Sequence, residues 1–348
     1  SKVVELPKFT NVTENKNIKV TFEIIPMRVI ITESPVESLV GTKYETLRKA
    51  LLAIETAGLT SESNVTTISL LQNIDDESNI IENKNLKIEL NGQTLNSKND
   101  SPTLTVISAQ LNIIDTNEEN GKISNEKVEA IKIEESGKVT LGTDDESVSQ
   151  VSPTIQGVRY GVNTKGTFNY YDGKIIGNVA INGNPTDLPY LKNPGITVEE
   201  GNQIATLVTV LNAEATIGKK NFTQLELAIE YANNKIAEDG SQVEIVIVKD
   251  LTKEEEITVD ETKNIKLDLN GFVTTLNATF VNNGKLEIID TSEENTGKLV
   301  SNIPSAIVNK NNMIINGGSF ETNFAGTSNA KVYLIRNEEY LEVNNGSV

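Results

Sequence analysis

Short apolar runs recur along most of the chain, and residues that favour turns separate them. Residues 67–70 and 86–90 alternate apolar and polar positions, which is typical of strands with one buried and one solvated face. Asn-Gly, Asp-Asp and Ser-Gly pairs interrupt the runs and indicate tight turns. Successive runs begin about 20–25 residues apart, the usual length of one turn of a parallel β-helix. The pattern therefore predicts a solenoid of stacked β-coils.

Two segments follow a helical period instead. Apolar residues recur at helical spacing between Tyr44 and Ile54, and Gly58 suits the C-terminal end of that helix. Residues 222–232 show the same pattern. Because each segment stands just before a set of strand-like runs, we expect one short amphipathic helix ahead of each set.

The chain contains an internal duplication that keeps order and spacing. Residues 86–92 return as 265–271, and residues 111–120 return as 286–295. A repeat of this kind builds elongated structures more often than a single catalytic cleft. We therefore predict three parts: an N-terminal β-rich segment, which serves as a linker or an inter-subunit docking element, and two β-helix modules. Their boundaries are 1–40, 41–217 and 218–348.

Two pairs of residues, Asn91-Gly92 and Asn270-Gly271, stand at equivalent places in the two repeats. Asn and Gly tolerate a positive φ, so the simplest interpretation is a corner between strands rather than a reactive turn. Stacked Asn side chains inside a solenoid can also bond to one another.

Two motifs carry a resemblance to a known family: Leu-Asn-Gly, and Leu-x-Ile-Ile-Asp-Thr. With the helix before each repeat, they resemble the right-handed parallel β-helix (pectate-lyase-like) repeat modules of Firmicutes cell-surface proteins. The resemblance implies a mainly β fold of tandem right-handed parallel β-helices, each preceded by one short amphipathic capping helix. It also implies a role as stalk, adhesive surface or filament component.

The composition limits the partners. The chain has 348 residues, with 31 Lys and Arg against 49 Asp and Glu, for a formal net charge of −18. Such an acidic protein is repelled by phosphate backbones and anionic lipids, so we expect no nucleic acid as partner. No window approaches the ~18 apolar residues of a membrane span, so we expect no membrane insertion. Cys and His are both absent, which is compatible with the cytosol or with a Gram-positive exterior.

Acidic turns follow the duplicated Ile-Ile-Asp-Thr motif and offer the hard oxygen ligands that Ca²⁺ prefers. They match no EF-hand loop, and acidic loops in an acidic chain are usually only solvated. No other cofactor is expected. The Ca²⁺ candidates are Asp115, Glu118, Glu119, Asp290, Glu293 and Glu294.

Residues 159–172 are the most aromatic stretch of a chain with 5% aromatic residues. Aromatic faces stack on sugar rings, so this stretch is the candidate contact for surface glycans. The alternative is an aromatic stack within the coils, where it stabilises the fold. The glycan-binding candidates are Arg159, Tyr160, Tyr170 and Tyr171.

No catalytic residue is identified. A lyase or hydrolase would need a cationic base beside bound Ca²⁺ or paired carboxylates across a cleft, and no such spacing is visible. We therefore predict a non-enzymatic extracellular structural protein, a β-solenoid subunit of a bacterial surface filament or stalk. The segment 27–32 before the first helix has a counterpart in 204–211, which suggests head-to-tail self-association in which the N-terminal segment docks on the C-terminal coil of the next subunit. The alternatives are a glycan-binding adhesin module and, less favoured, a polysaccharide lyase-like enzyme.

Overall fold

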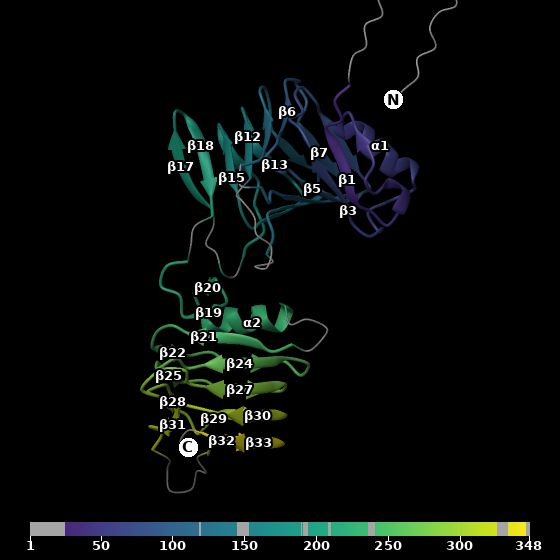
Figure 1. Cartoon of the computed structure of the whole chain (residues 1–348). Helices are drawn as coiled ribbons and strands as arrows, with labels where there is room; N and C mark the ends of the chain where they lie inside the picture. Colours follow the sequence, from purple (N-terminus) through teal and green to yellow (C-terminus); the bar gives the residue numbers. More distant parts are fainter. Residues whose placement is uncertain are drawn as a thin grey trace, which may run out of the picture.

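The computed structural model describes residues 25–117, 120–144, 153–188, 190, 194–207, 210–235, 241–325 and 333–345. In this part of the chain, short parallel strands stack into two sets of coils, and one α-helix stands at the start of each set (Figure 1). The coils form a β-solenoid of about 9 turns. With 47% strand and 8% helix the fold is mainly β, and the predicted fold class of tandem parallel β-helices is confirmed.

The first module winds through three parallel sheets. The first sheet contains β3 (Thr66–Leu70), β5 (Asn85–Glu89), β8 (Gln110–Ile114), β11 (Lys138–Leu141) and β14 (Thr167–Tyr170). The second contains β6 (Thr94–Ser97), β9 (Lys122–Asn125), β12 (Thr154–Gly157) and β15 (Lys174–Gly177). The third contains β4 (Asn79–Glu82), β7 (Leu104–Ile107), β10 (Ile131–Ile133), β13 (Tyr160–Thr164) and β16 (Val179–Asn182).

Alternation along each strand explains how the coils close around a core. In β5, Leu86 and Ile88 point inward and are almost fully buried, while Lys87 between them is half-buried on the outer face. The parallel register places Leu86 beside Leu111 and stacks apolar side chains from one coil to the next. Each inward row therefore becomes a continuous apolar column.

The N-terminal end of the first module is closed by a small antiparallel cap. The cap consists of β1 (Val29–Glu33), the 3₁₀ turn Glu37–Leu39, β2 (Lys43–Tyr44) and α1 (Leu47–Thr56). β1 pairs antiparallel with both β2 and β3, and the side chains of Val29 and Ile31 are fully buried in the first core. Residues 29–33 thus pair and pack with the first module. Residues 1–24 lie outside the described part.

The two capping helices begin on carboxylates. The amide nitrogen of Arg48 in the first turn of α1 lies 2.7 Å from the carboxylate of Glu77, and Thr46 accepts a further bond from Lys49. In the second module, Leu225 donates its amide to Glu214 over 3.0 Å. Anionic acceptors at a helix N-terminus satisfy amides that have no intrahelical partner and complement the helix dipole.

The C-terminal end of the first module is closed by a hairpin. It is formed by β17 (Gly195–Glu199) and β18 (Asn202–Thr206). β18 pairs antiparallel with β15, the last strand of the second sheet, so parallel stacking ends there. The sequence comparison of residues 204–211 with residues 27–32 is therefore wrong: the run starting at 204 belongs to this hairpin.

The second module repeats the first from its cap onward. Its cap consists of β19 (Ala215–Ile217), β20 (Lys220–Phe222) and α2 (Leu225–Lys235). Its first sheet contains β21 (Val243–Ile247), β24 (Asn264–Asp268), β27 (Lys285–Ile289), β30 (Asn312–Ile315) and β33 (Tyr340–Val343). The second contains β22 (Leu251–Lys253), β25 (Val273–Leu276), β28 (Lys298–Ser301) and β31 (Ser319–Thr322). The third contains β23 (Ile257–Val259), β26 (Phe280–Asn282), β29 (Ser305–Asn309) and β32 (Tyr333–Asn337).

A ladder of Asn side chains runs inside the second module. Asn282 and Asn309 are fully buried, and the amide of Asn282 donates to the side-chain oxygen of Asn309 over 2.7 Å. Asn309 in turn donates to Asn337 over 2.6 Å. The prediction that stacked Asn side chains bond to one another is confirmed for this column.

Candidate functional site: a polar groove on the first module

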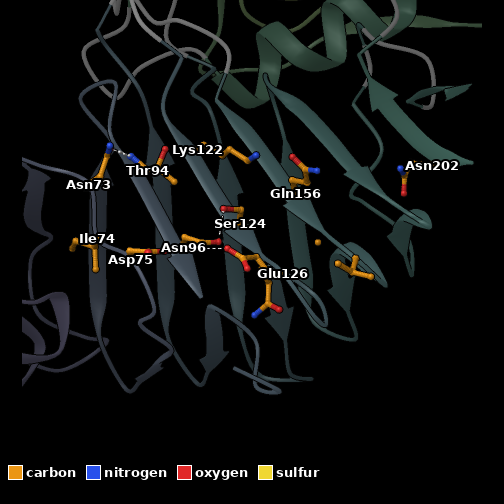
Figure 2. Close-up of a pocket in the computed structure, with 13 residues that line it drawn as sticks. Asn73, Ile74, Asp75, Thr94, Asn96, Lys122, Ser124, Glu126, Gln156 and Asn202 are labelled. Atoms are coloured by element: carbon orange, nitrogen blue, oxygen red, sulfur yellow. Dashed lines mark hydrogen bonds between the residues drawn. The ribbon is translucent and has the colours of Figure 1, made fainter. Parts of the chain in front are cut away.

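A polar groove of about 890 Å³ crosses the outer face of the second sheet of the first module (Figure 2). The groove follows from the alternation of the strands that line it. Leu95 of β6 and Ile123 of β9 point into the core, so their neighbours Asn96 and Ser124 point outward into the groove. Equivalent positions on successive coils thus place a row of polar side chains side by side.

Asn96 forms the centre of a hydrogen-bonded network that links three coils. Its amide nitrogen donates to the carboxylate of Asp75 over 2.8 Å and to that of Glu126 over 2.9 Å. Its side-chain oxygen accepts a bond from the hydroxyl of Ser124 over 2.8 Å. Because one amide group bridges both carboxylates, their bonded oxygens lie roughly 5 Å apart.

The electrostatics of the network favour the ionised form of Asp75. The hydrogen bond from Asn96, together with Lys98 at 2.6 Å, holds the pKa of Asp75 below its usual value. A general acid of a glycosidase needs the opposite shift, a carboxyl that keeps its proton near neutral pH. The carboxylate of Asp75 is therefore suited to accept hydrogen bonds from a ligand rather than to protonate a leaving group.

Other lining side chains remain available to a ligand. Among the described residues, the side chains of Lys122, Gln156 and Asn202 make no hydrogen bond, and Figure 2 shows them at the groove. They come from β9, β12 and the capping hairpin, respectively. The groove therefore combines a rigid carboxylate–amide network with unpaired donors and acceptors, an arrangement that can bind a polyhydroxylated or amide-bearing ligand.

Sequence reasoning missed this groove. Asn96 and Ser124 lie 28 residues apart, and each alone is an ordinary polar position on a strand. The groove could have been found only by aligning the strands of successive coils, because this alignment places their outward polar residues side by side. That register cannot be read from either residue by itself.

The acidic turns predicted to bind Ca²⁺ have a different role in the structure. The carboxylate of Asp290 accepts bonds from the amides of Gly271, Ser292 and Gly297 over 2.9, 3.2 and 2.6 Å. Burial alone would raise the pKa of Asp290, but these bonds and one from the Ser292 hydroxyl outweigh it and hold the pKa below its usual value. The carboxylate therefore ties the corner of one coil to the corner of the coil before it.

The first module has a corner with the same three kinds of backbone bond. Asp115 is fully buried and accepts bonds from the amides of Gly92, Asn117 and Gly121. A Cβ at Gly121 would lie 2.7 Å from an oxygen of that carboxylate, so only glycine allows this close approach.

The Asn-Gly pairs stand at these corners in the left-handed region. Asn91 and Gly92 have φ values of 51° and 72°, and Asn270 and Gly271 have 47° and 82°. The side-chain amides of Asn91 and Asn270 each donate to a backbone carbonyl of the preceding coil. The structural interpretation of these turns is confirmed.

The described Ca²⁺ candidates do not join a cluster that resembles a metal site. Glu293 and Glu294 are exposed, while Glu118 and Glu119 lie outside the described residues. Within the described residues, no group of three or more acidic side chains is placed to hold a metal ion.

The four predicted glycan contacts do not form one surface. Tyr170 is 1% exposed, its ring stacks 5.8 Å from that of Phe168, and its hydroxyl donates to the carbonyls of Gly173 and Ala205. The interior position of Tyr170 corrects its assignment as a sugar contact and agrees with the alternative of an aromatic stack within the coils. Tyr171 packs against the second core.

The other two candidates lie toward the surface. Arg159 is exposed and Tyr160 is half-buried at the start of β13, without a ring contact to Tyr170 or Tyr171 among the described aromatic pairs. Of the predicted set, Arg159 is therefore exposed, Tyr160 and Tyr171 are half-buried, and Tyr170 is enclosed in the core.

A junction of buried polar and aromatic side chains joins the two modules. Asp144, just after β11 of the first module, accepts hydrogen bonds from the hydroxyls of Tyr190 over 2.6 Å and Tyr231 over 3.0 Å. Lys220 of β20 donates to its carbonyl over 3.1 Å and lies 3.7 Å from its carboxylate. Both side chains of this ion pair are only 12% exposed.

Aromatic rings surround this ion pair. Tyr190, Phe222 and Tyr231 lie 5.4–5.9 Å apart between ring centres, and the Lys220 ammonium stands over two of the rings. Burial raises the pKa of Tyr190 strongly, with a further contribution from Asp144, so its hydroxyl stays a donor at all ordinary pH values. We refer to these five residues as the Asp144 junction.

Comparisons with known proteins leave the function to be inferred from this geometry. No protein-family model, curated protein or solved structure matches the chain. Among the described residues, neither helix is long and apolar enough to cross a membrane. The groove and the Asp144 junction are therefore the features from which a function is argued.

Proposed function

We propose that the chain is a non-enzymatic structural protein of a bacterial cell surface, an elongated β-solenoid segment of a stalk or filament. The Asp144 junction carries this proposal. A mere tether between two solenoids needs no specific contacts, whereas here a buried ion pair, two tyrosine hydroxyls and a ring cluster fix one module against the other. A spacer that transmits force along a stalk or filament requires such a fixed geometry between its repeats.

The path of the chain supports the same role. Leu188 and Tyr190 pack with the second core, the chain then returns to form the β17–β18 hairpin on the first module, and it crosses again to β19. The chain thus passes between the two modules several times, and they are not joined by a single linker. High acidity suits a solvent-exposed protein, and the absence of Cys is compatible with a Gram-positive exterior as well as with the cytosol.

Head-to-tail self-association is part of the proposal, and it rests on the last coil of the second module, where β31, β32 and β33 each end their sheet among the described strands. A heterologous contact between unlike ends does not close, so repetition of it would grow a fibre. Negative-stain electron microscopy at near-neutral pH, combined with sedimentation velocity, tests the proposal. Filaments with a regular axial repeat would support both the fixed geometry and the self-association. Isolated two-lobed particles with one constant angle between the lobes would support the fixed geometry and contradict the self-association. Particles whose lobes adopt many relative angles would contradict it.

A second candidate function, glycan binding, rests on the polar groove. Its outward amides, carboxylates and lysine offer hydrogen bonds to sugar hydroxyls along several coils. Among the described residues, no aromatic side chain lines the groove for stacking on a sugar ring, so binding would depend on hydrogen bonds and would be weak for a short oligosaccharide.

Gln156→Ala tests the glycan candidate because this side chain faces the groove without a partner among the described residues. Thr105→Ala is the matched control, since Thr105 is a half-buried outward residue on β7 of the third sheet. A glycan array followed by calorimetry should show at least a threefold loss of affinity for Gln156→Ala alone, about 0.7 kcal/mol. Equal affinities for the wild type and both variants would exclude the groove as the binding site.

A further inference from the structure

β17 forms the outer border of the second sheet in the first module (Figure 1). One of its edges pairs with β18 over the full length of the strand, from Gly195 to Glu199. Within the described part of the chain, no strand pairs with its other edge. β17 is thus an edge strand of this sheet, and β18 lies between it and β15, the last parallel strand of the sheet.

The hairpin turn determines which backbone groups face that edge. Glu200 and Gly201 have φ values of 49° and 81°, so the strands are joined by a two-residue turn of type I′. In such a hairpin the flanking pair, Glu199 with Asn202, is hydrogen-bonded, and bonded pairs alternate along the ladder. The N–H and C=O groups of Ile196 and Val198 therefore point away from β18.

The side chains of the same two residues form an exposed apolar row. Ile196 is 49% exposed and Val198 is 69% exposed, and alternation places both on one face of the strand. Proteins usually protect an edge of this kind with a Pro, a Lys or a bulge. β17 has none of these, and its register with β18 is regular throughout.

We propose that β17 is the pairing edge for a second copy of this chain, joined antiparallel about a two-fold axis through Thr197. In this register Ile196 faces Val198 of the second copy, and Val198 faces its Ile196. The outward backbone groups then form roughly four hydrogen bonds between the copies. The four apolar side chains gather on one face of the combined sheet.

The charges of the strand favour this occupant. In the symmetric register Glu199 stands opposite Gly195 of the second copy, so the two carboxylates lie at opposite ends of the pair. No like charges face each other along β17, although the chain as a whole carries −18. Self-complementarity of this kind is what an isologous interface requires.

This pairing is independent of the proposed head-to-tail contact. A two-fold interface closes at two copies, whereas a head-to-tail contact continues. A dimer through β17 can therefore exist whether or not the protein forms filaments, and it would join two filaments side by side if filaments form.

The absence of Cys allows a direct test. Across an antiparallel pair, Thr197 would face Thr197 of the second copy at a non-hydrogen-bonded position, with Cα atoms about 4.5 Å apart. That separation lies within the range of a disulfide. Thr197→Cys should therefore form a covalent dimer under mild oxidation. The control is Thr252→Cys, an exposed Thr at the centre of the edge strand β22.

Val198→Lys provides the second arm of the test. Because Val198 is already exposed, the substitution leaves the hairpin folded while it places a charge on the pairing face. Sedimentation velocity should show a dimer for the wild type, a monomer for Val198→Lys, and a dimer for Val198→Thr, which keeps a β-branched side chain. A monomeric wild type would overturn the proposal, as would equal cross-linking of the two Cys variants.

Discussion

Asp290→Ala is the sharpest test of how the coil corners are held together. The substitution removes the acceptor of three backbone amides, those of Gly271, Ser292 and Gly297, and the amide of Gly297 is buried. A hydrogen bond to a charged group contributes about 1.5–3 kcal/mol, and water can replace part of the two half-buried bonds. We therefore expect the second module to lose about 3–5 kcal/mol of unfolding free energy, a large effect for one residue.

Glu293→Ala is the matched control because Glu293 lies on the same turn, carries the same charge and is exposed. We expect it to change the unfolding free energy by less than about 0.5 kcal/mol. Urea unfolding followed by hydrogen exchange and mass spectrometry separates the two modules, which need not unfold together. The stability of the first module should stay unchanged in both variants.

Two results would refute this account of the corner. One is a loss of less than about 1 kcal/mol in Asp290→Ala, which would mean that water replaces all three bonds. The other is an equal loss in both variants together with stabilisation of the wild type by added Ca²⁺, as expected if the acidic turn binds the ion. In the second case the prediction of Ca²⁺ binding would be right, and the hydrogen bonds to Asp290 would contribute less to stability than the bound ion.

Three further outcomes are expected. The pKa of Asp290 in the folded state lies below its usual value of 3.8, so its contribution to the unfolding free energy is present above that pH and is lost as the pH falls through the folded pKa. Hydrogen exchange measured along an acid titration should therefore show a smaller loss of stability for Asp290→Asn than for the wild type. Asp144→Asn should weaken the junction by about 3 kcal/mol and raise the radius of gyration in small-angle scattering while both modules stay folded. Asn309→Ala interrupts the buried Asn ladder and should cost the second module about 2–3 kcal/mol in urea unfolding.

The coil architecture could be predicted because it depends on local patterns that occur twice. Alternating apolar positions fix which side chains point inward, and the duplicated Leu-Asn-Gly and Ile-Ile-Asp-Thr motifs fix where the corners fall. Asn91 and Asn270 do adopt the positive φ that the Asn-Gly pairs predicted. In each case the information lies within about one coil of sequence.

The features that were not predicted from the sequence depend on contacts between distant coils. Tyr231 reaches Asp144 across 87 residues, and the groove arises only when three coils are in register. The apolar run from Ile204 is compatible with several strand partners. It pairs with β15 because β15 is the last strand of its sheet in the first solenoid and has a free edge there. The aromatic stretch was compatible with two interpretations, a glycan contact or a stack within the coils, and composition could not choose between them. The ring of Tyr170 fills the interior.

The hairpin and the second cap together explain why the chain forms two modules instead of one long solenoid. β18 runs antiparallel to β15, so no further parallel coil can be added to that sheet at this end. The chain must then begin a new stack, and it does so as at the start, with β19 antiparallel to β21 as β1 is to β3. No described sheet contains strands of both modules. A pulling force across the chain therefore acts on the chain crossings and on the Asp144 junction, and the side-chain contacts of the junction should yield before the backbone ladders of either solenoid.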